Sequence, residues 1–201
     1  MWIILSSDGA VSYDMPQGER RGLEVDLYDF TYDGTINDNS LSGGLGQLMD
    51  GVEGQSNFRV DPSSIGIKGY EWVGWKNESF TRNPLEIIFK FDAVRNFSAL
   101  RLHVNNMYSK EVRVFSGARV YFSLNGRTYK QPPVDYQYMR DTLIEYARTV
   151  NVPLGPNNIG RYVRVQFYFD SKWLLVSEVQ FESSKFMTCW LWKIIHRKPK
   201  Q

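Results

Sequence analysis

Apolar and polar residues alternate from Leu85 onward, at the period of two expected when one face of a strand lies in a core. Leu85, Ile87, Phe89 and Phe91 fall on one face of the first such run. The alternation returns in five later runs, namely Leu100 to Val104, Val120 to Leu124, Val150 to Leu154, Val163 to Phe169 and Trp173 to Phe181. Because Gly, Pro or Asn separates these short runs, the pattern predicts an all-β sandwich or jelly roll rather than βαβ units.

The segments between the runs give weaker signals. Asn125-Gly126 is typical of a type I′ turn and predicts a hairpin that continues through Arg127 to Lys130. Asp33 to Pro62 is rich in Gly, Asp, Asn and Ser, which predicts a long structured loop of the kind that often carries function. Tyr138 to Ala147 fits either a helical turn or a loop, and the pattern leaves both open.

Composition agrees with strands, since 15% of the 201 residues are aromatic and such rings suit a half-buried pleated surface. We expect one domain over residues 1–184 and a C-terminal tail over residues 185–201, disordered or derived from truncation. The apolar N-terminus is too short for a signal peptide, and Phe186 to Ile195 is too short to span a bilayer.

Charge and cysteine content exclude several classes of partner and bond. The 24 Lys and Arg residues nearly balance the 22 Asp and Glu residues, and no basic stripe runs along a predicted strand, so we expect no nucleic acid partner. Cys189 is the only cysteine, so no intrachain disulfide can form.

Catalytic motifs are missing from the sequence, which predicts that the chain is not an enzyme. No Walker loop, GxSxG, HExxH, HRD or DFG is present, and Gly44 to Met49 lacks the third glycine of a dinucleotide fingerprint. The alternation places His103 opposite Leu102 and Val104, which predicts a surface histidine. One Cys and two His residues cannot form a zinc site of the usual spacing.

Oxygen ligands are available, and they favour a calcium site. Asp50 lies in a glycine-rich turn whose backbone carbonyls could coordinate a hard cation. Glu178 lies in the apolar run Trp173 to Phe181, where an ionised side chain is costly unless it is paired or bound to metal. The alternative is that Glu178 faces solvent. The Asn37-Asp38-Asn39 sequence lacks the frame of an EF-hand loop.

Two sequons, at Asn77 and Asn96, would accept glycans if the chain enters the secretory pathway.

Four motifs resemble the second, discoidin-like domain of the discoidin domain receptors: LYDFTYDG from Leu27, GGLGQLMDGV from Gly43, GYEWVGW from Gly69 and WLLVSEVQF from Trp173. The shorter HVNNMYS and NVPLG segments fit as well, and the resemblance covers about residues 5–184. It implies a jelly roll of about eight core strands with long loops.

The resemblance also implies a structural calcium ion, Ca²⁺. Family positions correspond to these metal-site residues: Tyr28, Gln47, Asp50, Val52, Ser177 and Glu178, with Tyr70 and Trp72 in the same neighbourhood. Main-chain carbonyls would serve at several of them. The sequence departs from the family at Tyr28, where relatives have a glycosylated Asn, and at Val104, which replaces a cysteine of a disulfide.

The implied function is a non-catalytic extracellular module of a single-pass, collagen-activated receptor tyrosine kinase, or a secreted fragment of one. It would support the neighbouring collagen-binding discoidin domain, contribute to cell adhesion and receptor self-association, and meet collagen only indirectly. The alternative is a carbohydrate- or phospholipid-binding module, for which Trp72 and Trp75 could form a platform.

Overall fold

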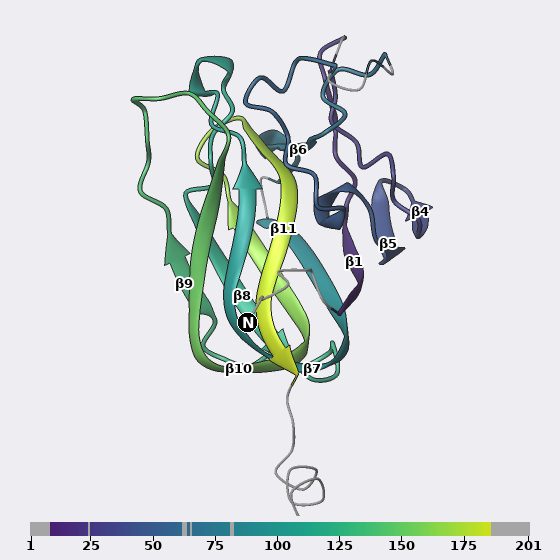
Figure 1. Ribbon diagram of the computed structural model, residues 1–201, viewed down its shortest axis with the longest axis vertical. Helices are drawn as coiled ribbons and strands as arrows, with labels where there is room; N and C mark the ends of the chain where they lie inside the picture. Colours follow the sequence, from purple (N-terminus) through teal and green to yellow (C-terminus); the bar gives the residue numbers. More distant parts are fainter. Residues whose placement is uncertain (1–8, 24, 62–63, 65, 81–82, 186–201) are drawn as a thin grey trace, which may run out of the picture.

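Two long antiparallel strands organise the protein, β7 (Leu85–Val104) and β10 (Arg148–Tyr168), which pair along most of their length in the computed structural model (Figure 1). The structure describes residues 9–23, 25–61, 64, 66–80 and 83–185. Strands in globular proteins usually have about five or six residues, so both strands are long enough to belong to two layers of a sandwich.

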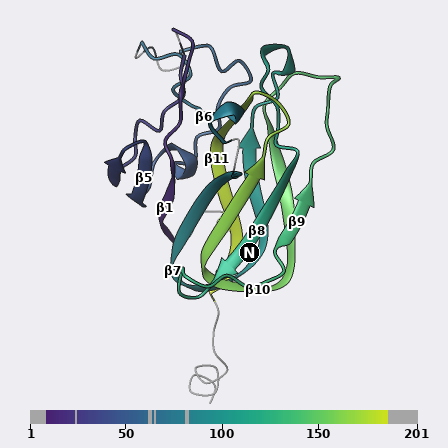
Figure 2. The same cartoon turned by 180° about the vertical axis from the view of Figure 1, so that it is seen from behind.

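The pairing of the remaining strands shows these layers. The first half of β7 pairs with β1 (Ala10–Pro16), and its second half pairs with β11 (Trp173–Lys185), which in turn pairs with β6 (Val73–Lys76). The second half of β10 pairs with β8 (Gly117–Ser123), and β8 pairs with β9 (Val134–Gln137). The all-β jelly-roll prediction is therefore confirmed, and Figure 2 shows the same sandwich from behind.

Smaller elements surround one side of the sandwich. The order of the strands in the large sheet extends from β1 through β5 to β4, and a separate two-stranded sheet contains β2 and β3. These elements are β2 (Arg20–Arg21), β3 (Val25–Asp26), β4 (Thr35–Asn37), β5 (Ser40–Gly44) and the 3₁₀ turns η1 (Gln47–Met49), η2 (Asn77–Phe80) and η3 (Tyr108–Lys110).

Phenylalanine rings fill the centre of the sandwich. Phe91 meets Phe97 and Phe181 edge to face, with ring centroids 4.8 and 5.3 Å apart, and Phe89 meets Phe181 at 5.0 Å. Edge-to-face rings at such distances add about 0.5–1.5 kcal/mol per pair beyond the burial of their area. The alternation read from the sequence therefore identified the correct inward face of the first part of β7, whereas β11 is buried on both faces from Trp173 to Val179.

Three predictions about the connections need correction. The Leu85 to Phe91 and Leu100 to Val104 runs are one continuous strand, because β7 bends between layers without leaving the sheet. Asn125-Gly126 does not close a tight hairpin, since β8 pairs with β9 across residues 124–133 and only Gly126 of the two has a positive φ. The predicted loop over Asp33 to Pro62 contains the β4–β5 hairpin, whose turn residues Asp38 and Asn39 take positive φ.

Between Tyr138 and Ala147 the backbone is an irregular loop, which settles the alternative that the sequence left open. The N-terminal apolar residues and the predicted tail beyond Lys185 lie outside the described residues.

Candidate functional site

The turn around Asp50 lies against β11, where two hydrogen bonds fix it. The amide of Gly51 donates to Glu178 Oε2 at 3.0 Å, and the amide of Gly54 donates to Ser177 Oγ at 3.0 Å. Inside the turn, the amide of Val52 donates to the Asp50 carboxylate at 2.8 Å. Residues more than 120 positions apart in sequence therefore meet at one place.

A cavity of about 160 Å³ opens between this turn and the neighbouring loop. It is lined by five residues, namely Gln47, Asp50, Val52, Tyr70 and Glu71. Four of these five belong to the predicted calcium set, and Glu178 reaches the same turn through Gly51. Glu71 was not predicted from the sequence; its carboxylate accepts a hydrogen bond from the amide of Gln55 at 3.0 Å.

Both predicted carboxylates are held in surroundings that disfavour their charge. Only 3% of Glu178 is exposed, and burial, with a smaller effect of the Asp50 charge, raises its pKa to about 8. Burial also raises the pKa of Asp50. Among the described residues, no Lys or Arg forms an ion pair with either carboxylate. Two uncompensated acids beside one cavity fit a bound cation.

Gln47 is held in place from both ends of its side-chain amide. Its Oε1 accepts a hydrogen bond from the amide of Phe30 at 2.7 Å, and its Nε2 donates to the carbonyl of Tyr70. A carbonyl oxygen has two acceptor sites, so Gln47 Oε1 and the Tyr70 carbonyl each keep one for a cation.

Asp29 supports this arrangement and was missed from the sequence. It is 3% exposed, accepts the hydroxyl of Tyr13, and accepts the amide of Gln47 at 3.0 Å. Burial raises the pKa of Asp29, and burial followed by the nearby Asp29 charge raises the pKa of Tyr13. The sequence did carry a signal for Asp29. It lies two residues after the buried Leu27, and in an extended chain such residues point to the same face.

Two other members of the predicted set contribute packing. The rings of Tyr28 and Phe30 meet edge to face at 5.8 Å, and Phe30 stacks on Tyr70 at 5.7 Å, which forms an aromatic row beside the cavity. Trp72 is buried, and its indole N–H donates to the Gln55 carbonyl at 3.2 Å.

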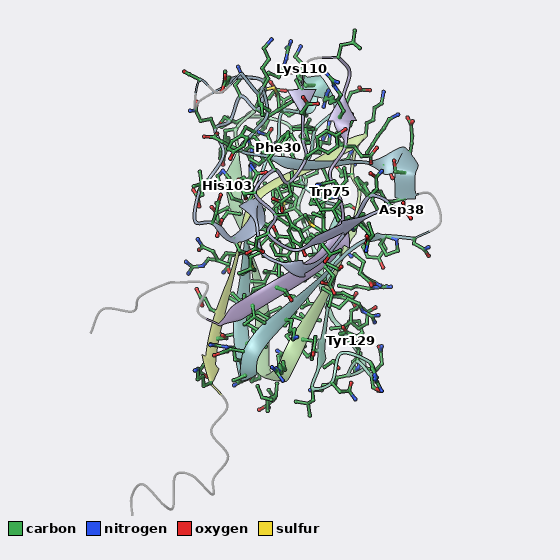
Figure 3. The ribbon with its side chains drawn as sticks, turned by 90° about the vertical axis from the view of Figure 1, so that its right-hand side faces the viewer. Phe30, Asp38, Trp75, His103, Lys110 and Tyr129 are labelled. Carbon is green, nitrogen blue, oxygen red and sulfur yellow. The ribbon has the colours of Figure 1, made fainter. Side chains whose placement is uncertain are left out.

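Trp72 and Trp75 cannot form a binding platform, because they are 1% and 0% exposed. The indole N–H of Trp75 donates to the Pro16 carbonyl at 2.8 Å, so the ring is satisfied inside the core (Figure 3). Both rings therefore serve packing, and the platform considered for the carbohydrate- or phospholipid-binding alternative is not formed.

His103 is not the surface residue that the sequence predicted. It is 8% exposed, its Nε2 lies 3.0 Å from the Gly54 carbonyl, and its ring stacks on Trp72 at 5.5 Å. The segment at Gly54, which follows the Asp50 turn, covers His103 on the outer face of β7, and sequence periodicity cannot show such a cover.

The two sequons differ in their surroundings. Asn77 is exposed at the start of η2, whereas Asn96 lies within β7, opposite Ile159 and Ser184, with its side-chain carbonyl buried and without a hydrogen-bond partner. Exposed loop positions suit glycan acceptors, so the structure favours Asn77.

Within the part of the chain that the structure describes, no three His, Cys, Asp or Glu residues gather into a metal cluster. The candidate site instead combines two carboxylates with amide and backbone oxygens, which is the donor set of calcium rather than of zinc. None of the described helices has the length and apolar character needed to cross a membrane.

The fold and the loops that surround this cavity define a discoidin-type jelly-roll domain. Among solved structures, the C-terminal domain of a chitobiase from Bacteroides fragilis shares this fold, with a TM-score of 0.51 at 12% identity, over 91% of this chain and 99% of that one.

Residues 9–183 match the family model of the discoidin domain-containing receptor 1/2, DS-like domain. The chain is 37% identical to epithelial discoidin domain-containing receptor 1 of Mus musculus, over 88% of this chain and 20% of the relative. It is 33% identical to discoidin domain-containing receptor tyrosine kinase B of Caenorhabditis elegans, over 88% of this chain and 21% of the relative.

The chain therefore belongs to the discoidin-like domain family of the discoidin domain receptors. It spans about a fifth of the length of these relatives, and the matched region is the discoidin-like domain, which is not an enzyme.

Proposed function

We propose that this chain is an extracellular structural module whose loops are locked onto the jelly roll by one calcium ion. The observation that carries this proposal is the meeting of Asp50 and Glu178 at one turn, without a basic partner among the described residues, beside a cavity lined by further oxygen donors.

The ion would be held by the carboxylates of Asp50 and Glu178 and by oxygens of Gln47, Tyr70 and Val52. It would supply the positive charge that the two acids lack, so that both could stay ionised at neutral pH. Tyr28, Trp72 and Ser177 would support these ligands, with Ser177 holding the amide of Gly54 at 3.0 Å.

A rigid module of this kind suits a receptor that must position its ligand-binding part. By its family, the chain would orient a neighbouring discoidin domain that binds collagen, and it would contribute to self-association of a receptor with a tyrosine kinase. A glycan on the exposed Asn77 fits the same extracellular setting.

The test is thermal unfolding of the 201-residue chain in excess calcium and in a chelator, together with metal analysis of the purified protein. An ion present at 100 times its dissociation constant adds about 2.7 kcal/mol, which raises Tm by roughly 5–10 °C for a domain of this size. We expect this rise in the parent and its loss in Asp50→Asn and Glu178→Gln.

Asp135→Asn is the matched control, because Asp135 is an exposed carboxylate on β9 that pairs with Arg119 at 2.8 Å. It should keep the full response to calcium. A parent protein that contains no calcium and ignores added calcium would refute the proposed ion.

A further inference from the structure

A second cavity, of about 360 Å³, lies at the opposite end of the protein from the ends of the described chain. Gly9 and Lys185 meet at Asp92, whose amide donates to the Gly9 carbonyl at 2.6 Å and whose carboxylate pairs with Lys185 at 3.2 Å. Lys110, which lines the cavity, is at the far end in Figure 3. This end is thus free of the described chain termini.

Three separate segments contribute to the cavity, which we call the Arg21 pocket. The described residues that line it are Arg21, Gly22, Leu23, Val25, Phe58, Arg59 and Lys110. Three of them are cations and none is an acid, whereas the rest are apolar or glycine. The aliphatic stems of Arg and Lys add further apolar wall below their charged ends.

Arg21 is built into this pocket. Its guanidinium carbon lies 5.2 Å from the centroid of the Phe58 ring and 5.4 Å from that of Trp173. Its Nη2 donates to the Lys110 carbonyl, which joins β2 to η3. Two aromatic contacts and one hydrogen bond therefore fix the plane of the guanidinium.

The guanidinium of Arg21 keeps an unused donor in this framework, and the Glu111 charge offsets its positive charge only in part. Among the described residues its Nη1 has no hydrogen-bond partner, and no carboxylate forms an ion pair with it. Burial lowers the pKa of Arg21; the Glu111 charge opposes this effect, and the Arg59 charge adds a smaller lowering. The nearby Glu111 carboxylate pairs instead with Lys172 at 3.5 Å. A half-buried cation with an unused donor is costly unless an anion joins it.

Leu23, one of the apolar residues that line the pocket, is open to solvent. Leu23 is 88% exposed at the turn between β2 and β3, although a side chain of this kind usually gains about 1.5–3 kcal/mol from burial. An occupant that covered Leu23 and reached Arg21 would need an apolar body and an anionic group on the same molecule.

We propose that the Arg21 pocket binds an amphipathic organic anion, meaning a small apolar group that carries a sulfate, phosphate or carboxylate. The apolar group packs against Phe58, Val25 and Leu23. The anionic group is held by Arg21, Arg59 and Lys110. Planar guanidinium groups bind such oxyanions through two parallel hydrogen bonds, which gives direction as well as strength.

The experiment uses three probes that separate the anionic group of the proposed ligand from its apolar group. 4-Methylphenyl sulfate carries both groups, inorganic sulfate carries the charge alone, and 4-methylphenol carries the ring alone. Binding to the full chain is followed by NMR through the backbone amides of Gly22, Leu23 and Arg59. We expect saturable shifts with 4-methylphenyl sulfate, at roughly tenfold lower concentration than with either partial probe, because two kinds of contact act together.

The decisive variant is Arg59→Gln combined with Lys110→Gln, which leaves Arg21 and its packing intact. Loss of two charge-assisted contacts should weaken 4-methylphenyl sulfate binding by roughly tenfold or more. The control, Arg127→Gln combined with Lys130→Gln, removes the same charge near Tyr129 at the other end of the molecule and should bind as the parent does (Figure 3).

Three results would overturn the proposal. The first is the absence of saturable shifts at Gly22, Leu23 and Arg59. The second is an equal response to inorganic sulfate and to 4-methylphenyl sulfate, which would reveal only a charge effect. The third is equal weakening in both double variants. Calcium plays no part in these outcomes, so failure here would leave the proposed calcium module standing.

Discussion

Replacing Glu178 by Gln should remove a large part of the pH dependence of stability of the calcium-free protein. The folded-state pKa of Glu178 is raised from 4.5 to about 8 by burial, followed by a smaller effect of the Asp50 charge. A carboxyl group with a raised pKa stabilises the fold in its protonated form. Its contribution is therefore complete below pH 4.5 and is lost as the pH rises through about 8.

The magnitude follows from the two pKa values. One protonation changes the free energy of unfolding by about 1.4 kcal/mol per pH unit, so the span from 4.5 to about 8 corresponds to roughly 4–5 kcal/mol as an upper bound. Glu178 is 3% exposed, so solvent screening reduces this little. Gln resembles the protonated acid and can still accept the amide hydrogen of Gly51, so the variant keeps the contact and loses the titration.

The assay is urea unfolding in a chelator at several pH values between 5 and 8. We expect the stability of the parent to fall with pH across this range, and that of Glu178→Gln to fall much less. Excess calcium should restore the parent near pH 8 and leave the variant unchanged, because the ion binds the ionised carboxylate. Equal slopes for parent and variant, or a parent whose calcium-free stability rises with pH, would refute the reasoning.

Three further predictions concern the core, the contact between His103 and Gly54, and the sequons. Phe97→Ala should cost about 3–5 kcal/mol in urea unfolding, since the ring is 1% exposed and contacts the rings of Phe91, Phe122 and Phe181; a cost below about 1 kcal/mol would contradict the packing. His103→Ala should cost roughly 1–3 kcal/mol, because the Gly54 carbonyl at 3.0 Å loses its partner; faster amide exchange at Gly54 would localise the effect, and unchanged exchange would argue against it. After secretion from a eukaryotic cell, Asn77→Gln should remove the mass of one glycan and Asn96→Gln should remove none, and mass spectrometry that gave the reverse would overturn the assignment.

The sequence by itself determined the class of fold and the inward face of the strands. Alternation at Leu85, Ile87, Phe89 and Phe91 predicted four core residues, and all four are at most 1% exposed. Such patterns are reliable because the side-chain period of a strand is fixed by its covalent geometry. The sequence also singled out Asp50 and Glu178 as candidate ligands, since a carboxylate among glycines and a carboxylate in an apolar run are both informative, and the structure brings Glu178 to the turn that carries Asp50.

Other features depended on contacts between distant segments, and only the tertiary structure decided them. Nothing near His103 in sequence shows that the turn at Gly54 covers it, and nothing near Asn125 shows that β8 pairs with a strand beginning at Val134. Local propensity describes what a segment can adopt alone, whereas pairing and cover are set by where the rest of the chain comes to lie.

The two cavities show the same division. The residue types of the calcium-site candidates could be read from the sequence, but the cavity between Gln47, Asp50 and Tyr70 depends on tertiary contacts, in which Asp29 accepts the amide of Gln47 and Glu178 accepts the amide of Gly51. Arg21, Phe58 and Lys110 gave no sequence signal, since they are far apart in the chain and belong to no motif. Their charged and apolar groups form one pocket only because folding brings three separate segments of the chain together.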